Sequence, residues 1–560
     1  MLNKLLPDWQ MVKRVLGFCL KEGWPVVVIG LASMIELAHI ATSSWLPFYS
    51  YLNDSLTLVA IRQVFAHKEP FTFIFSSGFN VFPECIYFVI SIIFKSVRSS
   101  IYVNALLNMA LLYILFRFIA SRVLSSRLKG QFFGLIASLV FLVEMLLERM
   151  PFINESAVAT LFLFNTYYYG TTLSALFVTG LYLLLLNRQK VSFKKNLWLL
   201  VLINLASGLA TFSNPLFVIE FLAPLLIILL FFWIIDFISF SKLIFLYSGS
   251  LIGAFIGYMA RGFFKRFIGQ NTGSHINPSA IPQSLTLLHA TVRQYLDTNY
   301  GKLELGILLI TILVSTAFAL FLINKNVKRT SHRSQSLILV SLLGITVTVT
   351  CLLFVVFTGT RTTRYLVIMF IFPLLGLLPV FDSAVVKKYQ KSLSIITALV
   401  LILFTVWGII SIPNTNNLLN PDTYPDAACL EASLDHKPAN GAAGLTDAKP
   451  LDIYGQNNER VLQVTGGVSI YPWLANLADY SHKTFTFVIV DRNSVNNGIY
   501  SYQSVFSILR APNSITPCQT FWVFRYNPSS TGYVILNKDI QSSYQADYRL
   551  WQEDKTADLF

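Results

Sequence analysis

One carboxylate stands close to the expected end of the first membrane helix in this sequence. It is Asp54, in the stretch SYLNDSLTLVAIRQ that begins at Ser50, directly after the first long apolar run. Late in the chain, the stretch TGTRTTRY (358–365) carries Arg361 and Arg364. A positioned carboxylate can accept a proton from a reacting group, and a guanidinium can bind a phosphate through two parallel hydrogen bonds. Because ionisable side chains at membrane depth or at the membrane interface are costly, residues of this kind suggest a functional site.

The composition indicates a membrane protein. The chain has 560 residues, of which 54% are hydrophobic and 12% are charged, whereas soluble domains have about 25% charged residues. The 46 Phe and 25 Tyr fit a lipid-facing protein with aromatic belts. The formal net charge of +14 fits Lys and Arg in short cytoplasmic loops, which orient membrane helices. The sequence shows no stripe of basic residues within a soluble fold, so we expect no nucleic-acid partner.

Apolar runs long enough to cross a bilayer, which takes about 20 residues, occur about eleven times. We therefore expect a membrane all-α fold over residues 1–411, followed by a soluble α/β domain over residues 412–560. The expected spans are 23–40, 102–121, 131–148, 169–187, 196–213, 215–235, 243–263, 303–323, 336–357, 365–381 and 394–411.

The short apolar segment CIYFVISIIFKS (85–96) decides which side every later loop faces. If it does not span, the positive charges near residues 122–129, 188–195, 325–333 and 387–391 all lie in cytoplasmic loops. The positive-inside rule therefore predicts that this segment lies in the outer interface. The N-terminus is then cytoplasmic, and the C-terminal domain lies outside.

With this topology, the unusual polar residues gather on the outer side of the membrane. They fall in the long loop 41–101, in the segments 146–170 and 264–302, and in the short loop 358–365. The candidate site residues in these regions are Asp54, Glu84, Asn154, Glu155, Arg361, Arg364 and Tyr365.

The C-terminal region after residue 412 is polar and rich in Asn and Ser. Its segment 426–436 has helical spacing, and 484–491, 520–526 and 532–539 are typical of strands. The segment 444–455 is interpreted as a strand, a loop and a return. The region holds two cysteines, Cys429 and Cys518; such a pair often forms a disulfide in an oxidising compartment, and the alternative is two unrelated thiols.

Familiar catalytic signatures are missing from the sequence. It contains no GxGxxG, Walker, HExxH or GxSxG motif, and its seven His show no metal-ligand spacing. We therefore expect no metal centre built from the protein alone, although one carboxylate and a substrate phosphate could together hold a divalent cation.

The order of these features resembles the GT-C superfamily of polytopic glycosyltransferases. The resemblance rests on a first span, an outer loop with an early acid at Asp54, and the segment FNVFPECIYFVISIIFKSVRSSIYVNALLNMALLYILFRF (79–118), led by Pro83. A late, short outer loop, RTTRY (361–365), adds to it. The similarity covers roughly residues 20–410. The C-terminal domain resembles the outer domain of many members in its placement.

The resemblance implies an enzyme that takes a sugar from a polyprenyl-phosphate donor at the outer face of the membrane. Asp54 would be the general base, Arg361 and Arg364 would bind the donor phosphate, and displacement would invert the anomeric carbon. The implied partners are the lipid-linked donor, membrane lipids and a glycan, lipid or protein acceptor such as lipopolysaccharide. The implied location is a bacterial inner membrane with a periplasmic C-terminal domain.

The sequence also departs from the family pattern. Many members carry two acids close together in the first outer loop, whereas Asp54 stands alone and Glu84 or Glu155 would have to supply a second. The paired prolines of the family are reduced to the single Pro83. The identity of the base is therefore open between Asp54, Glu155 and Glu84.

Structural interpretations compete with each functional one. Asp54 would equally well cap an interfacial helix, Glu155 would be a solvated loop acid, and Arg361 and Arg364 would anchor to lipid headgroups. Two other classes of protein also fit, namely a polymerase or ligase of the O-antigen type and a transporter of lipid-linked sugars. A transporter should show internal repeats and polar groups near the midplane, and a polymerase usually has a very large late loop.

Overall fold

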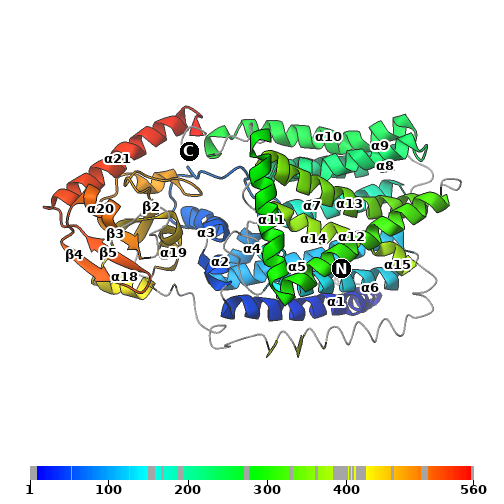
Figure 1. Ribbon diagram of the computed structural model, residues 1–560, viewed down its shortest axis with the longest axis horizontal. Helices are drawn as coiled ribbons and strands as arrows, with labels where there is room; N and C mark the ends of the chain where they lie inside the picture. Colours follow the sequence, from blue (N-terminus) through cyan, green and yellow to red (C-terminus); the bar gives the residue numbers. More distant parts are fainter. Residues whose placement is uncertain are drawn as a thin grey trace, which may run out of the picture.

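The structure is a computed structural model, and it describes most of the chain. The described residues are 9–43, 45–51, 53–124, 126–148, 158–164, 169–186, 193–269, 277–326, 332–359, 364–382, 402, 405–406, 409–410, 424, 426–455, 459–492 and 502–556. They form a bundle of long helices with a smaller α/β domain at one end (Figure 1).

Nine segments in the described part of the chain are long and apolar enough to cross a membrane. Each coincides with one of the spans expected from the sequence. A run of about 20 apolar residues is long enough to cross the bilayer, and in lipid a helix satisfies all of its backbone hydrogen bonds within the segment. They are α1 (Trp9–Thr42, from Gly23 on), α5 (Val97–Val123), α6 (Arg127–Leu147), α7 (Tyr169–Leu186), α8 (Phe193–Ser213), α10 (Phe240–Gly262), α12 (Asn299–Asn326), α13 (His332–Thr358) and the stretch Arg364–Asp382, which contains α14 (Val367–Leu375) and α15 (Leu378–Asp382).

Two expected spans differ from these nine. The run 215–235 forms the π-helical turn η3 (Val218–Leu222) and then α9 (Ala223–Ile234), so its continuous apolar helix is shorter than the others. The run 394–411 lies almost wholly outside the described residues. The segment 85–96 contains α4 (Ile86–Ile93), which at 1.5 Å per residue is about 12 Å long. That length is far too short to cross a hydrocarbon core of about 30 Å.

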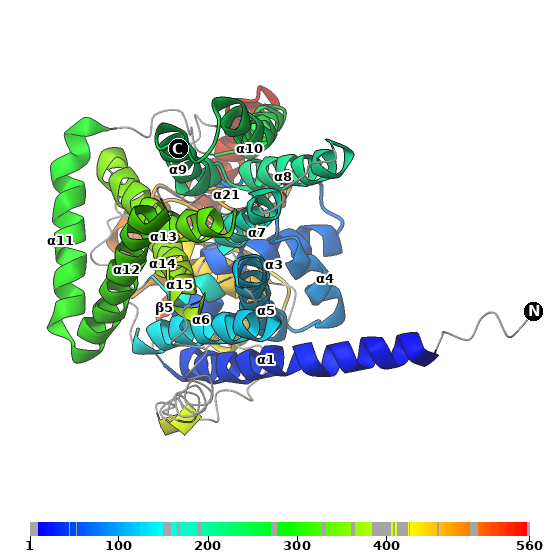
Figure 2. The same ribbon diagram turned by 90° about the vertical axis from the view of Figure 1, so that its right-hand side faces the viewer.

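Several short helices lie at the end of the bundle that faces the α/β domain. They are α2 (Leu46–Tyr51), α3 (Asn53–Ala66) and α4, together with α11 (Ile281–Asp297), which runs across the bundle axis at its edge (Figures 1 and 2). Figure 2 also shows the first half of α1 projecting away from the other helices. On α11, the side chains of Leu285, Val292 and Leu296 are exposed, as expected for a helix lying along a membrane interface.

Small residues let α8 and α10 approach each other closely. Gly249, Gly253 and Gly257 recur every fourth residue of α10, and the latter two lie against the backbone carbonyls of Asn204 and Gly208 on α8. A side chain at either position would collide with the neighbouring backbone. Close packing through small residues is a common way for helices to associate in lipid.

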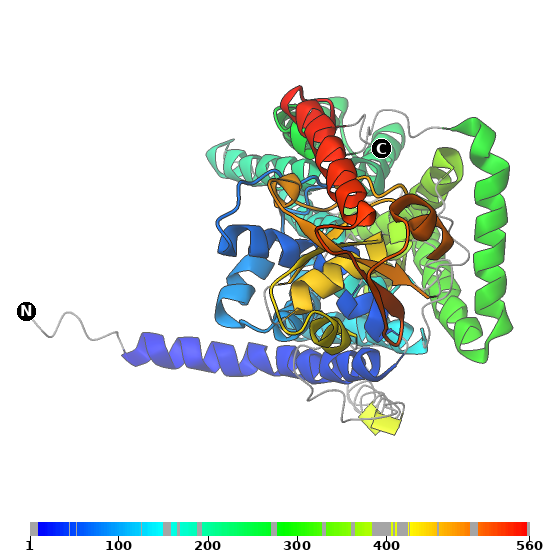
Figure 3. The same ribbon diagram turned by 90° about the vertical axis from the view of Figure 1, so that its left-hand side faces the viewer.

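The C-terminal domain is built on a five-stranded mixed sheet with strand order β2-β1-β3-β5-β4. β1 is parallel to β2 and β3, while β5 is antiparallel to β3 and β4. The strands are β1 (Asn440–Ala443), β2 (Arg460–Gln463), β3 (Phe485–Asp491), β4 (Ser514–Pro517) and β5 (Phe521–Arg525), and the helices are α18 (Ala427–Ser433), α19 (Leu445–Tyr454), α20 (Tyr502–Leu509) and α21 (Thr531–Gln552). Figure 3 shows this domain over the end of the helix bundle.

Three secondary-structure predictions for this domain are confirmed and two are wrong. α18, β3 and β5 fall where we expected them. The segment 444–455 instead forms α19, and 532–539 lies inside α21. The second error arose because Val534, Ile535 and Leu536 are typical of a strand. The helix begins because the Ser530 hydroxyl accepts a hydrogen bond from the Tyr533 amide, and it buries Gly532, Leu536 and Ile540 at helical spacing.

A disulfide joins Cys429 of α18 to Cys518, which follows β4. Their Cα atoms lie 5.9 Å apart, within the usual range for a disulfide. The bond ties the helix that opens the domain to the far edge of its sheet.

The domain is held against the helix bundle by backbone and side-chain contacts. The Asn476 side chain accepts a hydrogen bond from the Thr72 amide at 2.8 Å, and Phe73 forms an isolated β-bridge with Asn476. At the C-terminal end, the Thr556 hydroxyl donates to the carbonyl of Lys265 at 2.9 Å. The loop after α3 and the loop after α10 therefore both attach to the C-terminal domain.

Candidate active site

The structure brings together two of the residues singled out in the sequence. Asp54 lies in the first turn of α3, and Arg364 begins the 3-10 turn η7 (Arg364–Leu366) that leads into α14. Arg364 Nη1 donates to Asp54 Oδ2 at 2.6 Å, across 310 residues of sequence. The two side chains are 28% and 24% exposed, Asp54 being the more open. The pair is thus accessible to solvent, and it sets a carboxylate beside a guanidinium.

Buried neighbours fix the position of Arg364. The helix that follows it, α14, is buried along its whole length. Tyr365 is half-buried, and its ring meets Phe354 of α13 edge-on at 5.9 Å. Tyr365 therefore ties the turn that carries Arg364 to α13. Its place as a substrate-binding residue stays a prediction.

Three other predicted site residues, Arg361, Asn154 and Glu155, lie outside the described residues. Glu148 binds the residues that follow the segment with Asn154 and Glu155. Its carboxylate accepts hydrogen bonds from the amides of Val158 at 2.6 Å and Thr160 at 2.7 Å. A carboxylate bound by several backbone amides is a strong anchor, so Glu148 fixes residues 158–160 to the end of α6.

Glu84 lies in a separate, enclosed environment. Its side chain is 3% exposed, and burial raises the pKa of its carboxyl to about 7. The Ser213 hydroxyl, at the end of α8, donates to Glu84 Oε2 at 3.4 Å, and Gly170 at the start of α7 leaves the space that the carboxyl fills. These described contacts join Glu84 to α7 and α8, whereas Asp54 pairs with Arg364. A role for Glu84 in substrate binding stays a prediction.

The C-terminal domain contacts the chain just before Asp54. The Tyr454 hydroxyl of α19 donates to the carbonyl of Ser50 at 3.0 Å. The ring of Tyr51 packs edge-on against Tyr424 at 4.9 Å and Tyr454 at 5.5 Å. Since α2 ends at Tyr51, three residues before Asp54, the C-terminal domain helps to position the carboxylate.

Two further cationic side chains approach this segment. Arg98, in the first turn of α5, is buried and donates from Nη2 to the Tyr51 hydroxyl at 3.2 Å. Lys449 of α19 is 6% exposed, and α19 packs on α3. Burial lowers the pKa of Lys449 to about 7, although the charges of Asp54 and Asp452 oppose this shift. Basic side chains from α5, η7 and α19 therefore lie around the start of α3.

Sequence reasoning missed Lys449 because nothing in a single sequence shows which face of a soluble domain meets the membrane part. The sequence around Lys449 holds one weak indication of a special position. The segment 444–455 holds three charged residues, Asp447, Lys449 and Asp452, among apolar ones. No group of three or more His, Cys, Asp or Glu in the described part of the chain is placed to hold a metal ion. A divalent cation bound together with a substrate phosphate stays a hypothesis.

The chain is similar to a solved structure, but comparison of its sequence finds no match. No protein-family model matches the sequence, and no curated protein does either. Among solved structures, the chain is similar to the crystal structure of ArnT from Cupriavidus metallidurans bound to undecaprenyl phosphate, with a TM-score of 0.52. The alignment covers 91% of this chain and 99% of that chain at 11% sequence identity. The chain has a GT-C-like fold.

This likeness confirms the fold predicted from the order of spans, loops and C-terminal domain. It spans both the helix bundle and the α/β domain, because it covers nearly the whole length of both chains. At 11% identity it establishes the architecture, and the reaction is argued from the residues of the site.

Proposed function

We propose that this chain is an integral membrane glycosyltransferase that moves a sugar from a polyprenyl-phosphate-linked donor to an acceptor in the cell envelope. The acceptor would be a glycan, a lipid such as that of lipopolysaccharide, or a protein. The observation that carries the proposal is the Asp54–Arg364 ion pair, located in a fold whose solved relative binds undecaprenyl phosphate.

The chemistry follows from the two charges. An acceptor hydroxyl is a poor nucleophile until a base takes its proton as the new bond forms, and Asp54 is the proposed base. The bond that breaks joins the anomeric carbon to the donor phosphate. The released polyprenyl phosphate keeps the electron pair, and Arg364 stabilises that charge through hydrogen bonds. We infer inversion at the anomeric carbon, because a single displacement attacks from the face opposite the phosphate.

The ion pair also suggests how the site responds to its donor. In the structure, Arg364 is bound to Asp54 at 2.6 Å, so one carboxylate oxygen is engaged. A donor phosphate, with several acceptor oxygens, competes for the guanidinium. Arg364 would then turn toward the phosphate, and Asp54 would become free to accept the proton. We propose Arg361 as a second phosphate ligand because it lies three residues before Arg364.

The proposed location is a bacterial inner membrane, with the N-terminus in the cytoplasm and the C-terminal domain in the periplasm. The Cys429–Cys518 disulfide supports this orientation, because such bonds persist in oxidising compartments. The loops rich in Lys and Arg support it too. The Asp54 site would then lie at the outer face, where the sugar of a lipid-linked donor is exposed.

Mass spectrometry of envelope glycans and glycolipids tests the proposal. Cells expressing wild-type protein should contain a sugar-sized mass increment that is lost with Asp54→Asn at equal membrane levels. Persistence of the increment in Asp54→Asn would move the base to another residue, with Glu155 or Glu84 next. Accumulated lipid-linked sugar without any increment would contradict glycosyl transfer and favour transport.

A further inference from the structure

An open cavity lies where α5 ends and α6 begins, at the end of α5 opposite to the Asp54 site. Its volume of about 540 Å³ is within the usual range of small-molecule sites. The last part of α5, the turn after it and the first residue of α6 line it. Its described lining holds three arginines, Arg117, Arg122 and Arg127, and no acidic side chain.

The lining residues that belong to α5 share one face of that helix. Ile114, Arg117, Phe118, Ser121 and Arg122 line the cavity, and their spacing of three, four, seven and eight residues places side chains on the same side of a helix. The guanidinium of Arg122 lies over the ring of Phe118, 5.1 Å from its centre. This face therefore combines apolar surface with basic groups.

Close packing against α6 and α7 holds this face in place. Gly134 of α6 lies against Arg117, and a methyl group added there would meet the Cβ atom and the backbone nitrogen of Arg117 at 3.2 Å. The ring of Phe118 fills the space beside Gly180 of α7, where an added methyl group would overlap it. Two neighbouring helices thus fix the positions of Arg117 and Phe118, and the cavity is a built part of the bundle.

The depth of the cavity suits an amphipathic ligand. Arg98, near the start of α5, lies by the Asp54 site, since it donates to the Tyr51 hydroxyl. At 1.5 Å per residue, Ile114 and Arg122 lie about 24 and 36 Å further along the helix. The hydrocarbon core of a bilayer is about 30 Å thick. With Arg98 at one surface, Ile114 lies within the hydrocarbon and Arg122 lies beyond it, among the headgroups of the opposite surface.

Arg117 is the residue that membrane topology alone does not explain. Lys and Arg in short loops orient membrane helices, which accounts for Arg122 and Arg127 at the helix ends. Arg117 instead lies inside the span Val97–Val123 and is half-buried. A charge at that depth is costly, and residues of this kind often mark binding sites. An anion bound in the cavity would lower the cost.

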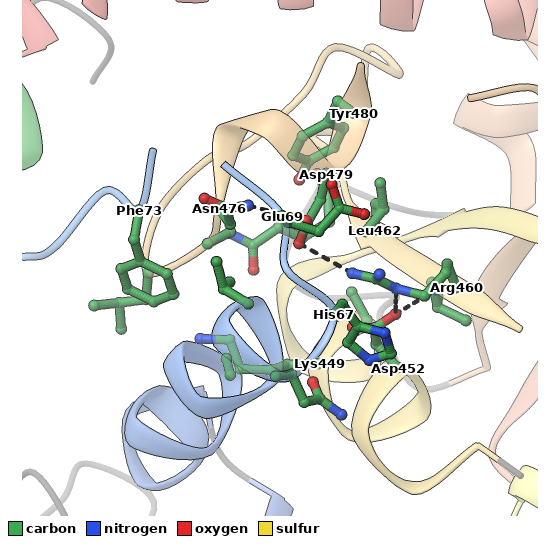
Figure 4. A pocket seen from close by; sticks show the side chains of 18 residues that line it. His67, Glu69, Phe73, Lys449, Asp452, Arg460, Leu462, Asn476, Asp479 and Tyr480 are labelled. Carbon is green, nitrogen blue, oxygen red and sulfur yellow. Dashed lines mark hydrogen bonds and ion pairs between the residues drawn. The ribbon is translucent and has the colours of Figure 1, made fainter. Parts of the chain in front are cut away.

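The polar cleft between α3 and the C-terminal domain shows the contrast. There Arg460 binds Asp452 at 2.7 Å and Asp479 at 3.0 Å (Figure 4), so neighbouring carboxylates already neutralise its charge. The described lining of the cavity at the end of α5 has three guanidinium groups and no carboxylate. An anion is therefore attracted to this cavity far more than to the cleft.

We propose that the cavity binds an anionic phospholipid of the surrounding bilayer. The arginines bind the phosphate, because a guanidinium matches phosphate oxygens with paired hydrogen bonds, and Ile114 and Phe118 lie beside the acyl chains. Basic pockets between membrane helices bind lipid headgroups in this way. In the proposed orientation, the lipid belongs to the cytoplasmic leaflet. The site does not depend on glycosyl transfer.

Titration of lipids onto the full-length protein in detergent tests the site. Native mass spectrometry counts the lipids bound as phosphatidylglycerol, which is anionic, or phosphatidylcholine, which has no net charge, is added. We expect phosphatidylglycerol to bind the wild type at least about tenfold more tightly. Arg117→Gln and Arg122→Gln should each weaken its binding about fivefold, as expected for one lost basic contact. Arg122 is exposed, so Arg122→Gln should keep the fold.

Lys129→Gln is the matched control. It removes a positive charge at the same end of the bundle, from a residue of α6 that does not line the cavity. Lys129 follows Arg127 by two positions, and residues two apart on a helix do not share a face. The affinity for phosphatidylglycerol should stay within about twofold of wild type. Equal weakening in Arg122→Gln and Lys129→Gln, or equal affinity of the wild type for the two lipids, would overturn the inference.

Two further measurements identify the ligand and separate the site from the proposed function. Excess inorganic phosphate should leave phosphatidylglycerol bound, and complete displacement would assign the cavity to free phosphate in place of a lipid. Asp54→Asn should lose the envelope product and bind phosphatidylglycerol as the wild type does. Failure of glycosyl transfer would thus leave this inference standing, and failure of lipid binding would leave the proposed function standing.

Discussion

Asp54→Asn should reduce product formation far more than it reduces stability. If Asp54 is the general base, its loss should slow the reaction about 10²–10⁴-fold, which corresponds to about 2.7–5.4 kcal/mol of barrier. The same change removes a partly exposed ion pair, with side chains 28% and 24% exposed. Such pairs contribute about 0–1 kcal/mol to folding. Asparagine can still occupy the first turn of α3 without steric change, so the helix should persist.

The rate should be measured as initial product formation per unit of membrane protein, followed by mass spectrometry over a time course. The thermal midpoint of each purified variant gives the stability. Asp435→Asn is the matched control, because Asp435 forms an exposed ion pair with Arg525 at 3.1 Å at the surface of the C-terminal domain. It should leave both the rate and the midpoint close to wild type.

A rate for Asp54→Asn within tenfold of wild type would refute the assignment of Asp54 as the base. A large loss of thermal stability together with lost activity would instead assign the ion pair a structural role.

Arg364→Lys tests the role of the guanidinium in binding the donor. It keeps the charge but loses the planar donor fork, so it should raise the apparent KM for the donor while the fold is retained.

Three further results are expected. Gly170→Ala should lower the thermal midpoint, because a Cβ at this position would collide with the buried Glu84 carboxyl, and the shift should be seen by thermal unfolding in detergent. Replacing Cys429 and Cys518 with Ser should destabilise the C-terminal domain by about 2–4 kcal/mol, detected as faster proteolysis of that domain than in wild type. The pKa of Asp447 is raised to about 7 by burial and by nearby carboxylates, so its contribution to stability is present at low pH and is lost as the pH rises from about 4 through 7. Asp447→Asn should flatten this part of the pH dependence of the thermal midpoint.

The membrane part of the fold could be predicted because its physical constraint is simple. A run of about 20 apolar residues has one stable structure in lipid, so the nine crossing helices in the described part of the chain follow from hydropathy. The C-terminal domain was harder, because short segments depend on their neighbours. Residues 532–539 have the composition of a strand, yet Ser530 starts a helix there and Leu536 and Ile540 bury its inner face.

The candidate site was predictable in part for a similar reason. Asp54 and Arg364 stood out because ionisable side chains at membrane depth or at the membrane interface are costly, and the structure joins them at 2.6 Å. Lys449 did not stand out, because charged residues are ordinary in a polar domain. Only the packing of α19 on α3 turns it into a residue of the site.

The residues of the site come from two parts of the chain, and this bears on how the protein would select its donor and its acceptor. The Asp54–Arg364 pair comes from the end of the helix bundle that faces the C-terminal domain, where we propose that the lipid-linked phosphate binds. The groups that surround it on the other side, Tyr454 and Lys449, come from the C-terminal domain. Function resides in sites carried by a fold rather than in the fold itself. We therefore expect the bundle to determine which leaving group is used, and the surface of α19 to help determine which acceptor is chosen.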